Sequence, residues 1–301
     1  MDQDQSLNPD FAYCLAASPN FNQDGLIFAA KKSGLYRSND KGQTWTNAYT
    51  SLQLNIPLPT TYVAVSSVDA VLYVFACVAG NLLRSIDGGE TWQIITLGSP
   101  APVITALAIS TNFAKDGTLI AATMQDGIFC SIDYGQKMTG WDFGLYDPNI
   151  NALALSPDFA DTKNVLAGTQ SSIFSSRNAG RSWRDLDFPI DAAPVLCLAF
   201  SRGVIYAGTE TEGLYCSQDN GQGWEQIIPG IVEHILADLN GNIVIVLDGV
   251  LRFSQDGGIT WQDQAGLDWE ITCLAAPHGL AADHPLLVGL SNGDIVTLPS
   301  L

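Results

Sequence analysis

Six times the chain repeats a short pattern in which Ser and an acid, or its amide, are followed by Gly and then by Trp. The copies read SNDKGQTW, SIDGGETW, SIDYGQKMTGW, SRNAGRSW, SQDNGQGW and SQDGGITW. Spacings of 37 to 49 positions separate the Trp residues, which is the period of a four-stranded propeller blade rather than of a helical solenoid. These residues are Trp45, Trp92, Trp141, Trp183, Trp224 and Trp261. The repeat therefore predicts an array of similar β units.

Each copy has the composition of a hairpin loop that caps itself. A Gly such as Gly42 permits backbone conformations closed to other residues, and the acid or amide accepts hydrogen bonds from amides of the same turn. The acceptors are Asp40, Asp87, Asp133, Asn178, Asp219 and Asp256. Because groups on six separate turns cannot converge on one site, we interpret these boxes as structural rather than as catalytic or calcium-binding.

Seven short apolar runs open the repeat units and predict seven innermost strands. They are YCLAAS (13–18), YVAVSS (62–67), TALAIS (105–110), NALALS (151–156), LCLAFS (196–201), HILAD (234–238) and TCLAAP (272–277). Two further apolar runs follow each of them, as expected of antiparallel strands in sheet order. We therefore predict an all-β fold, a single domain over residues 1–301 that forms a seven-bladed β-propeller with Asp-box turns.

The seventh unit departs from this plan, since it contains neither a box nor a fourth strand. Ring closure then requires an outer strand from residues around Ser6 to Phe11, or a last blade of three strands. A six-bladed ring is the alternative architecture.

An excess of acidic residues limits the possible partners. The chain has 13 Lys and Arg against 31 Asp and Glu, a formal net charge of −18. Such a surface repels phosphate groups, so we expect neither nucleic acid nor an anionic membrane as a partner. No apolar run is long enough for a membrane span, and the N-terminus lacks the features of a secretion signal. We expect a soluble, cytoplasmic protein, although a processed exported form would look the same.

Metal and cofactor sites have little support in the sequence. The chain has three His residues and no Cys-x-x-Cys or His-x-x-x-His spacing. Three of the six Cys residues occupy equivalent places in different predicted strands, which would keep them too far apart for a disulfide. We therefore expect no metal, no cofactor and core-packing Cys residues; the oligomeric state is left open.

The boxes, together with blade segments such as LALSPDF and GLYRSNDKGQTW, resemble the BNR or Asp-box repeat propellers over nearly the whole chain. That group includes sialidases, sortilin-type receptor domains, some xyloglucanases and the photosystem II assembly factors. The resemblance implies the propeller fold but not an activity, because enzymes and non-enzymes share the box. Most arginines of this chain flank boxes, so the converging arginines of sialidases have no counterpart, and neither has the arginine-rich patch of the assembly factors.

Loops on the face opposite the boxes hold the predicted binding residues. Trp269 is informative because it is the one Trp outside a box, and it stands between two acids. It could anchor a protein partner or stack on a sugar or a cation, or else pack between two blades. The predicted binding residues are Trp269, Asp268, Glu270, Tyr146, Asp147 and Asp126.

Catalytic candidates are sparse. His234 aligns with the first residues of the innermost strands and, next to Glu233, is the one acid–base candidate that titrates near neutral pH. Paired carboxylates could also come from facing loops, with Asp187 or Asp191 opposite Glu210 or Glu212. Our main hypothesis is a non-catalytic binding or assembly scaffold that presents an acidic, aromatic-containing loop face to a protein. The alternative is a carbohydrate-active hydrolase or lyase that acts on a glycan or small molecule at the same face.

Overall fold

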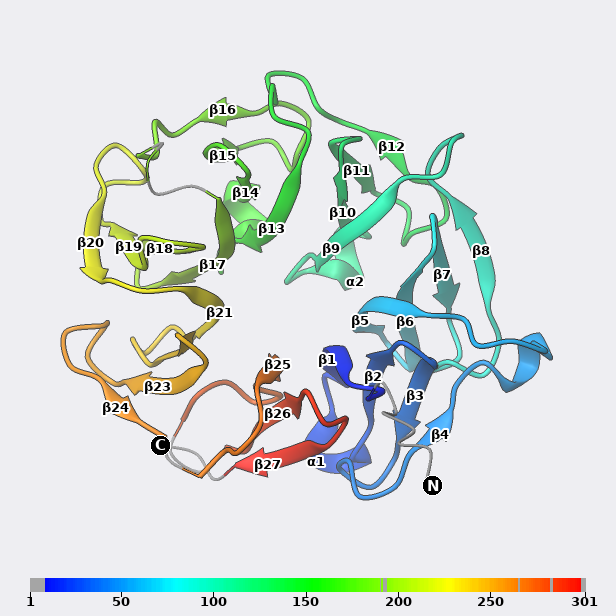
Figure 1. Cartoon of the computed structure of the whole chain (residues 1–301). Coiled ribbons are helices and arrows are strands. Elements are labelled where there is room, and N and C mark those ends of the chain that lie inside the picture. The colour runs from blue at the N-terminus through cyan, green and yellow to red at the C-terminus, as the bar shows by residue number, and fades with distance from the viewer. Residues whose placement is uncertain (1–8, 190, 192–193, 265, 282–283, 299–301) are drawn as a thin grey trace, which may run out of the picture.

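Seven antiparallel sheets surround a common axis in the computed structural model, as Figure 1 shows. The structure describes residues 9–189, 191, 194–264, 266–281 and 284–298. In every sheet the strands follow chain order, with the first strand nearest the axis. The seven-bladed prediction is therefore confirmed, and the six-bladed alternative is wrong.

The first four blades have four strands each. Blade 1 contains β1 (Ala12–Ala17), β2 (Ile27–Lys31), β3 (Gly34–Ser38) and β4 (Thr46–Asn47). Blade 2 contains β5 (Thr60–Val68), β6 (Val71–Val78), β7 (Asn81–Ser85) and β8 (Gln93–Thr96). Blade 3 contains β9 (Val103–Ile109), β10 (Leu119–Met124), β11 (Ile128–Ser131) and β12 (Thr139–Gly140). Blade 4 contains β13 (Ile150–Leu155), β14 (Val165–Thr169), β15 (Ile173–Ser176) and β16 (Arg184–Asp185).

The remaining blades follow the same plan except at the end. Blade 5 contains β17 (Val195–Ser201), β18 (Val204–Thr209), β19 (Leu214–Ser217) and β20 (Glu225–Ile228). Blade 6 contains β21 (Val232–Ala237), β22 (Ile243–Leu247), β23 (Val250–Ser254) and β24 (Gln262–Asp263). Blade 7 contains β25 (Ile271–Ala275), β26 (Leu286–Leu290) and β27 (Ile295–Leu298). The short helices are α1 (Phe21–Asp24), α2 (Phe113–Asp116), α3 (Phe159–Thr162) and the 3-10 helix η1 (Thr50–Leu52).

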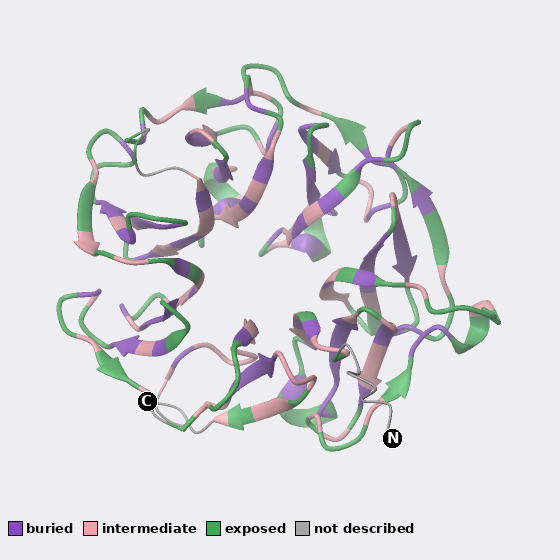
Figure 2. Cartoon of the chain, viewed as in Figure 1, coloured by how far each residue is buried: buried purple, intermediate pink, exposed green. Residues whose placement is uncertain are grey.

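Apolar packing between neighbouring blades forms the core. The second strand of each blade lies between two other sheets, so β14, β22 and β26 are buried along their whole length. Figure 2 shows this burial in the middle of the blades, with exposed outer strands. Burial on both faces explains why these strands are continuous apolar runs rather than alternating ones.

One irregularity recurs in all seven innermost strands. Each has one extra residue near its start that has no partner on the second strand, a β-bulge. In blade 6 this residue is Glu233, because β21 begins at Val232, before the predicted start. The predicted alignment of His234 with the first positions of the other strands is therefore wrong by one residue.

The box turns have the hydrogen bonds that their sequence predicts. In the second box the Ser85 hydroxyl donates to Asp87 (2.7 Å) and accepts from the Gly89 N–H (2.9 Å). Asp87 in turn accepts from the Thr91 N–H at 3.0 Å. The Trp that follows ties the box to the previous blade, since the indole of Trp92 donates to the carbonyl of Ala48 (2.9 Å).

Blade 7 closes the ring against blade 1 through its innermost strands. Cys273 and Leu287 of blade 7 share one apolar cluster with Leu15 and Ile27 of blade 1. In the described part of the chain blade 7 has three strands, as one of our two expectations had it. Of the segment expected to supply a fourth strand, residues 6–8 lie outside the described residues and residues 9–11 form no strand.

We predict that replacing Ser85 by Ala lowers the free energy of unfolding by about 1–3 kcal/mol, because the buried Gly89 N–H loses its acceptor. Urea denaturation measures the change. Ser51→Ala, at an exposed position of the 3-10 helix η1, is the matched control and should stay within about 0.5 kcal/mol of wild type. Equal stability of the two variants would contradict the role assigned to the box serine.

The boxes should also make stability depend on acid pH. Hydrogen bonds from Thr260 and Ser254 lower the pKa of Asp256 from 3.8 to about 2, and those from Ser38 and Thr44 do the same for Asp40. The stabilisation from these carboxylates is present above pH 4 and is lost as the pH falls toward 2.

Asp256→Asn should therefore melt below wild type at pH 6, and the difference in melting temperature should disappear between pH 4 and pH 2. Asn is the matched replacement because Asn178 already occupies this position in the fourth box. A difference in melting temperature that is the same at pH 6 and pH 2 would refute this account.

Candidate functional site

Strand order divides the loops between two faces. The turns from first to second strand and the box turns share one face, where the Lys41 N–H donates to Gly25 O (2.9 Å) and the Tyr134 N–H to Gly117 O (3.0 Å). The turns from second to third strand and the connections between blades form the opposite face, here called the loop face. Because the boxes are filled with their own hydrogen bonds, the loop face is the place to look for a site.

Cationic and acidic residues are distributed unequally between these two faces. Of the 13 cationic residues, Lys31 and Lys32 alone lie in a loop-face turn; the others stand in or beside boxes, on third strands or in the turns of the box face. From Asp185 onward the chain has two cations, Arg202 and Arg252, against 16 Asp and Glu. Arg252 forms an ion pair with Asp263 at 2.9 Å. The loop face of blades 5 to 7 is therefore strongly acidic.

Trp269 lies in the connection from β24 to β25 and is exposed (55%), so the alternative in which it packs between two blades does not hold. Asp268 and Glu270 on either side are exposed too. The connection is held in place because the carbonyl of Glu270 accepts from the Ser291 N–H (2.8 Å) in the turn from β26 to β27. The indole ring of Trp269 is therefore exposed to solvent on a loop whose backbone is held by a hydrogen bond.

The carboxylates of Glu270 and Asp248, from two other segments, act electrostatically on Glu233. Burial raises the pKa of Glu233, and the charges of Glu270 and Asp248 raise it further. Asp248 is fixed by the turn that follows β22, where its side chain accepts from the N–H of Ile231 (2.8 Å). We call this set the Trp269 surface; it comprises Ile231, Glu233, Asp248, Asp268, Trp269 and Glu270.

Sequence analysis does not assign two residues, Asp248 and Ile231, to this surface. Asp248 stands in a predicted loop-face turn, but no sequence pattern pairs it with Glu233. Ile231 is an exposed apolar residue (43%) that sequence reasoning missed, because its short connection has no other distinguishing feature.

The contacts of His234 indicate a structural role. Burial lowers its pKa, and a hydrogen bond to the backbone of Thr272 on the next innermost strand acts in the opposite direction. The same kind of bond joins other blades: Thr105 donates to Ile150 O (2.6 Å) and Asn151 to Val195 O (3.1 Å). His234 is therefore one of several side chains that link neighbouring innermost strands, and it remains neutral near pH 7.

Of the predicted carboxylate pairs, Asp191 and Glu212 both act on one phenol. Burial raises the pKa of Tyr215, and the charges of Glu212 and Asp191 raise it further. Glu210 is exposed in the turn from β18 to β19. Asp187 lies elsewhere, in an open cavity of about 680 Å³ at the edge of blades 4 and 5, next to Asp185. Burial and the charge of Asp187 raise the pKa of Asp185.

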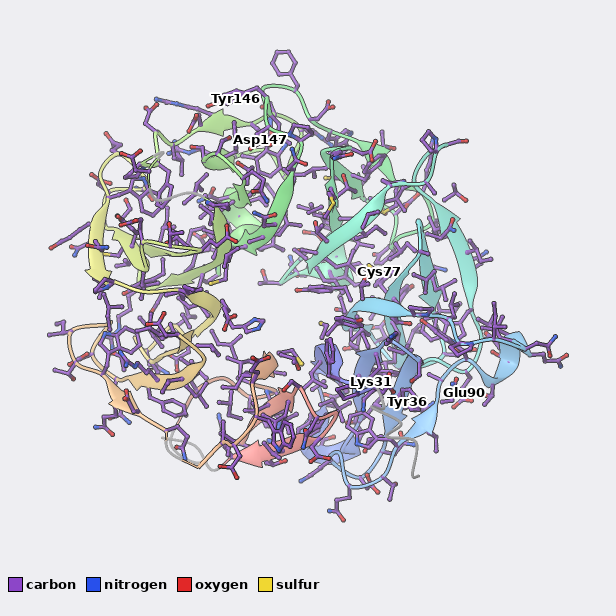
Figure 3. The ribbon with its side chains drawn as sticks, in the orientation of Figure 1. Lys31, Tyr36, Cys77, Glu90, Tyr146 and Asp147 are labelled. Carbon is purple, nitrogen blue, oxygen red and sulfur yellow. The ribbon has the colours of Figure 1, made fainter. Side chains whose placement is uncertain are left out.

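Tyr146 and Asp147 lie toward the outside of blade 4 in Figure 3 and belong to a separate region. Tyr146 is exposed but its ring contacts Phe174 edge-on, with centroids 4.8 Å apart. Burial opposes ionisation of Asp147, yet hydrogen bonds from Ser171 and Asn149 outweigh it and lower its pKa. Asp147 therefore fastens a loop. Asp126 is exposed in the turn from β10 to β11.

The six Cys residues are free thiols that pack in the apolar interior or at its edge. Burial raises the pKa of both Cys14 and Cys197 to about 12, which keeps these thiols protonated and unreactive.

Within the described residues, no three His, Cys, Asp or Glu side chains are placed to hold a metal ion. A search of the described helices finds none with the length and apolar character needed to cross a membrane.

Comparison with known proteins agrees with the fold. The BNR/Asp-box repeat family model matches residues 252–263. A probable oligoxyloglucan-reducing end-specific xyloglucanase from Neosartorya fischeri is 32% identical over 88 residues, which cover 27% of this chain and 10% of that enzyme. This chain thus matches about a tenth of the length of that relative.

Two solved structures extend the likeness to nearly the whole chain. YCF48 bound to D1 peptide has a TM-score of 0.72 at 15% identity and covers 98% of this chain and 94% of its own. The GH74 xyloglucanase from Xanthomonas campestris has a TM-score of 0.71 at 16% identity and covers 98% and 52%. Similarity at this level of identity shows the fold alone. With its seven radial sheets the chain is a seven-bladed β-propeller, and its sixth box matches the BNR/Asp-box repeat.

Proposed function

We propose that this protein is a non-catalytic binding scaffold whose loop face holds a positively charged segment of a protein partner at the Trp269 surface. The observation that carries the proposal is the exposed indole of Trp269, flanked by the exposed carboxylates of Asp268 and Glu270. Acids outnumber cations on the loop face of blades 5 to 7, and the Lys31 ammonium that reaches it donates to Gly293 O. YCF48, which has the same fold, was solved with a peptide bound, and this supports a peptide-binding role for the present chain.

The chemistry of the surface favours a basic partner. A Lys or Arg side chain can lie over the face of an exposed indole and form ion pairs with the carboxylates beside it. Burial and the charges of Glu270 and Asp248 oppose ionisation of Glu233, and a bound cation would favour its ionised form. A single-sign surface also accelerates the encounter with a partner of opposite charge.

The environment of His234 supports a binding role rather than catalysis at this surface. His234 is held between innermost strands by its bond to Thr272, so it is poorly placed to exchange protons with a substrate on the exposed loops. We therefore assign the carboxylates of the Trp269 surface an electrostatic role in binding.

We predict that Trp269→Ala weakens binding of a Lys- and Arg-rich dodecapeptide about tenfold, because a cation–π contact contributes about 1–2 kcal/mol. Isothermal titration calorimetry at 50 and 200 mM salt measures the affinity, which should fall as salt rises. Tyr146→Ala is the matched control, since Tyr146 is also an exposed aromatic residue (68%) but belongs to another blade. Equal losses in both variants, or stronger binding of an Asp- and Glu-rich peptide, would refute the proposal.

A second candidate function, a carbohydrate-active hydrolase, rests on the two carboxylates near Tyr215. Glycosidases use two acids that flank the bond they cleave, and Asp191 and Glu212 both act on the same phenol. The likeness to xyloglucanases is the reason to test xyloglucan first.

We predict that the purified protein releases no reducing sugar from xyloglucan oligosaccharides, and that Glu212→Gln behaves as wild type. A reducing-sugar assay from pH 4 to pH 8 checks this, with a GH74 xyloglucanase as the positive control. Hydrolysis by wild type that Glu212→Gln and Asp191→Asn both abolish would overturn the scaffold proposal in favour of the enzyme.

A further inference from the structure

The longest connection between blades joins blade 1 to blade 2, whereas the Trp269 surface lies on blades 6 and 7. Residues 48–59 join β4 to β5, twelve residues where the other described connections have three to nine. They contain η1 and project from the ring at the right of Figure 1. Connections of this length in a compact fold usually carry a function.

This connection is fastened at its base. The buried Tyr49 hydroxyl shares a hydrogen bond with Thr60 (2.9 Å), and its N–H donates to Asn47 (2.7 Å). Its ring contacts Trp92 edge-on, with centroids 5.4 Å apart. The loop is therefore anchored in the core before any ligand binds, which lowers the entropy cost of binding.

Above the anchor the connection forms a groove of about 460 Å³, which we call the blade 1 groove. Leu54 (46%) and Ile56 (76%) expose their side chains along it. Its lining residues are Ser33, Tyr36, Asn47, Tyr49, Thr50, Gln53, Leu54, Asn55, Ile56, Pro57 and Leu58. None of them is charged, although the chain as a whole has a net charge of −18.

Two charged residues beside the groove are engaged within the fold, whereas Lys32, next to Ser33, is exposed. The Asp10 carboxylate accepts from the Ser33 N–H (2.9 Å) and hydroxyl (2.5 Å). The Lys31 ammonium donates to Gly293 O (3.1 Å) and lies 5.8 Å from the centre of the Tyr36 ring, and Figure 3 shows these two side chains together on blade 1. A ligand against the lining residues therefore meets aliphatic surface and uncharged polar groups, and Lys32 is the exposed charge next to them in the chain.

We propose that the blade 1 groove binds an extended, uncharged segment of a protein partner. Leu54 and Ile56 cover its apolar side chains, and the side-chain amides of Gln53 and Asn55, which make no hydrogen bond within the described residues, pair with its backbone. A sugar fits less well, because Tyr49 is buried and Tyr36 is half-buried with its hydroxyl bonded to Ser33 (2.8 Å), which leaves no open aromatic platform. This site is independent of the Trp269 surface.

The test uses three fluorescent dodecapeptides and measures affinity by anisotropy. One alternates Val or Ile with Ser or Thr, one is rich in Lys and Arg, and one is rich in Asp and Glu. Wild type should bind the uncharged peptide, and Ile56→Glu should weaken that binding at least tenfold because it places a charge against apolar side chains. Ile94→Glu is the matched control, an equally exposed Ile on the outer strand of blade 2. It should bind as wild type does, and so should Trp269→Ala.

Each other outcome overturns the proposal. Binding of the uncharged peptide that survives both Ile56→Glu and Leu54→Ser, with circular dichroism showing both variants folded, places the peptide elsewhere. A preference for either charged peptide that Ile56→Glu removes shows that the occupant is charged. Self-association of wild type that Ile56→Glu abolishes in sedimentation shows that the groove receives a second copy of this chain. Because Trp269→Ala is measured in parallel, failure of the groove and failure of the Trp269 surface give different results.

Discussion

Apolar packing between adjacent blades is the interaction on which the rest of the structure depends. A three- or four-stranded sheet this small has no interior of its own, so each blade buries its second strand only by lying against its neighbours. The cluster that joins Val244 and Val246 of blade 6 to Val288 of blade 7 is typical, and the cluster with Leu287 and Ile27 joins the last blade to the first. Ring closure therefore stabilises every interface at once, and the loops project from a rigid frame.

The box turns divide the two faces chemically. Each box uses its own carboxylate and hydroxyl to satisfy amides of the same turn, and several indoles bond to the preceding blade, as Trp183 does with Trp141 O (3.0 Å). The polar groups of that face are thus engaged within the fold, and most of the cations stand among them. The excess negative charge of the chain remains on the loop face, where fewer internal partners neutralise it.

Sequence alone predicts the parts of this fold that depend on local interactions. The boxes, the seven blades and the buried second strands follow from turn chemistry and from runs of apolar residues. The β-bulge in each innermost strand does not, because its extra residue is defined by pairing with another strand, and this moved Glu233 rather than His234 to the aligned position. The sequence could not predict that Trp269 is exposed or that Asp147 is buried, since both depend on neighbours from distant segments.

Proximity between residues far apart in sequence is likewise a property of the ring. Glu233, Asp248 and Glu270 come from three segments of blades 6 and 7, and only the assembled frame shows that the charges of Asp248 and Glu270 act on Glu233. The action of both Asp191 and Glu212 on Tyr215 is likewise visible only in the structure.

Two surfaces of different chemistry stand on one rigid frame, on either side of blade 7. We propose that the Trp269 surface binds a cation, so its affinity should fall as salt rises, whereas the blade 1 groove should bind an uncharged segment with little dependence on salt. A partner that carries both kinds of segment would bind the second one intramolecularly, which raises its overall affinity without any new contact. Such a partner would bind more tightly than either segment alone and would tolerate salt better than a purely basic one. This combination gives a scaffold selectivity that neither a charged surface nor an apolar groove provides by itself.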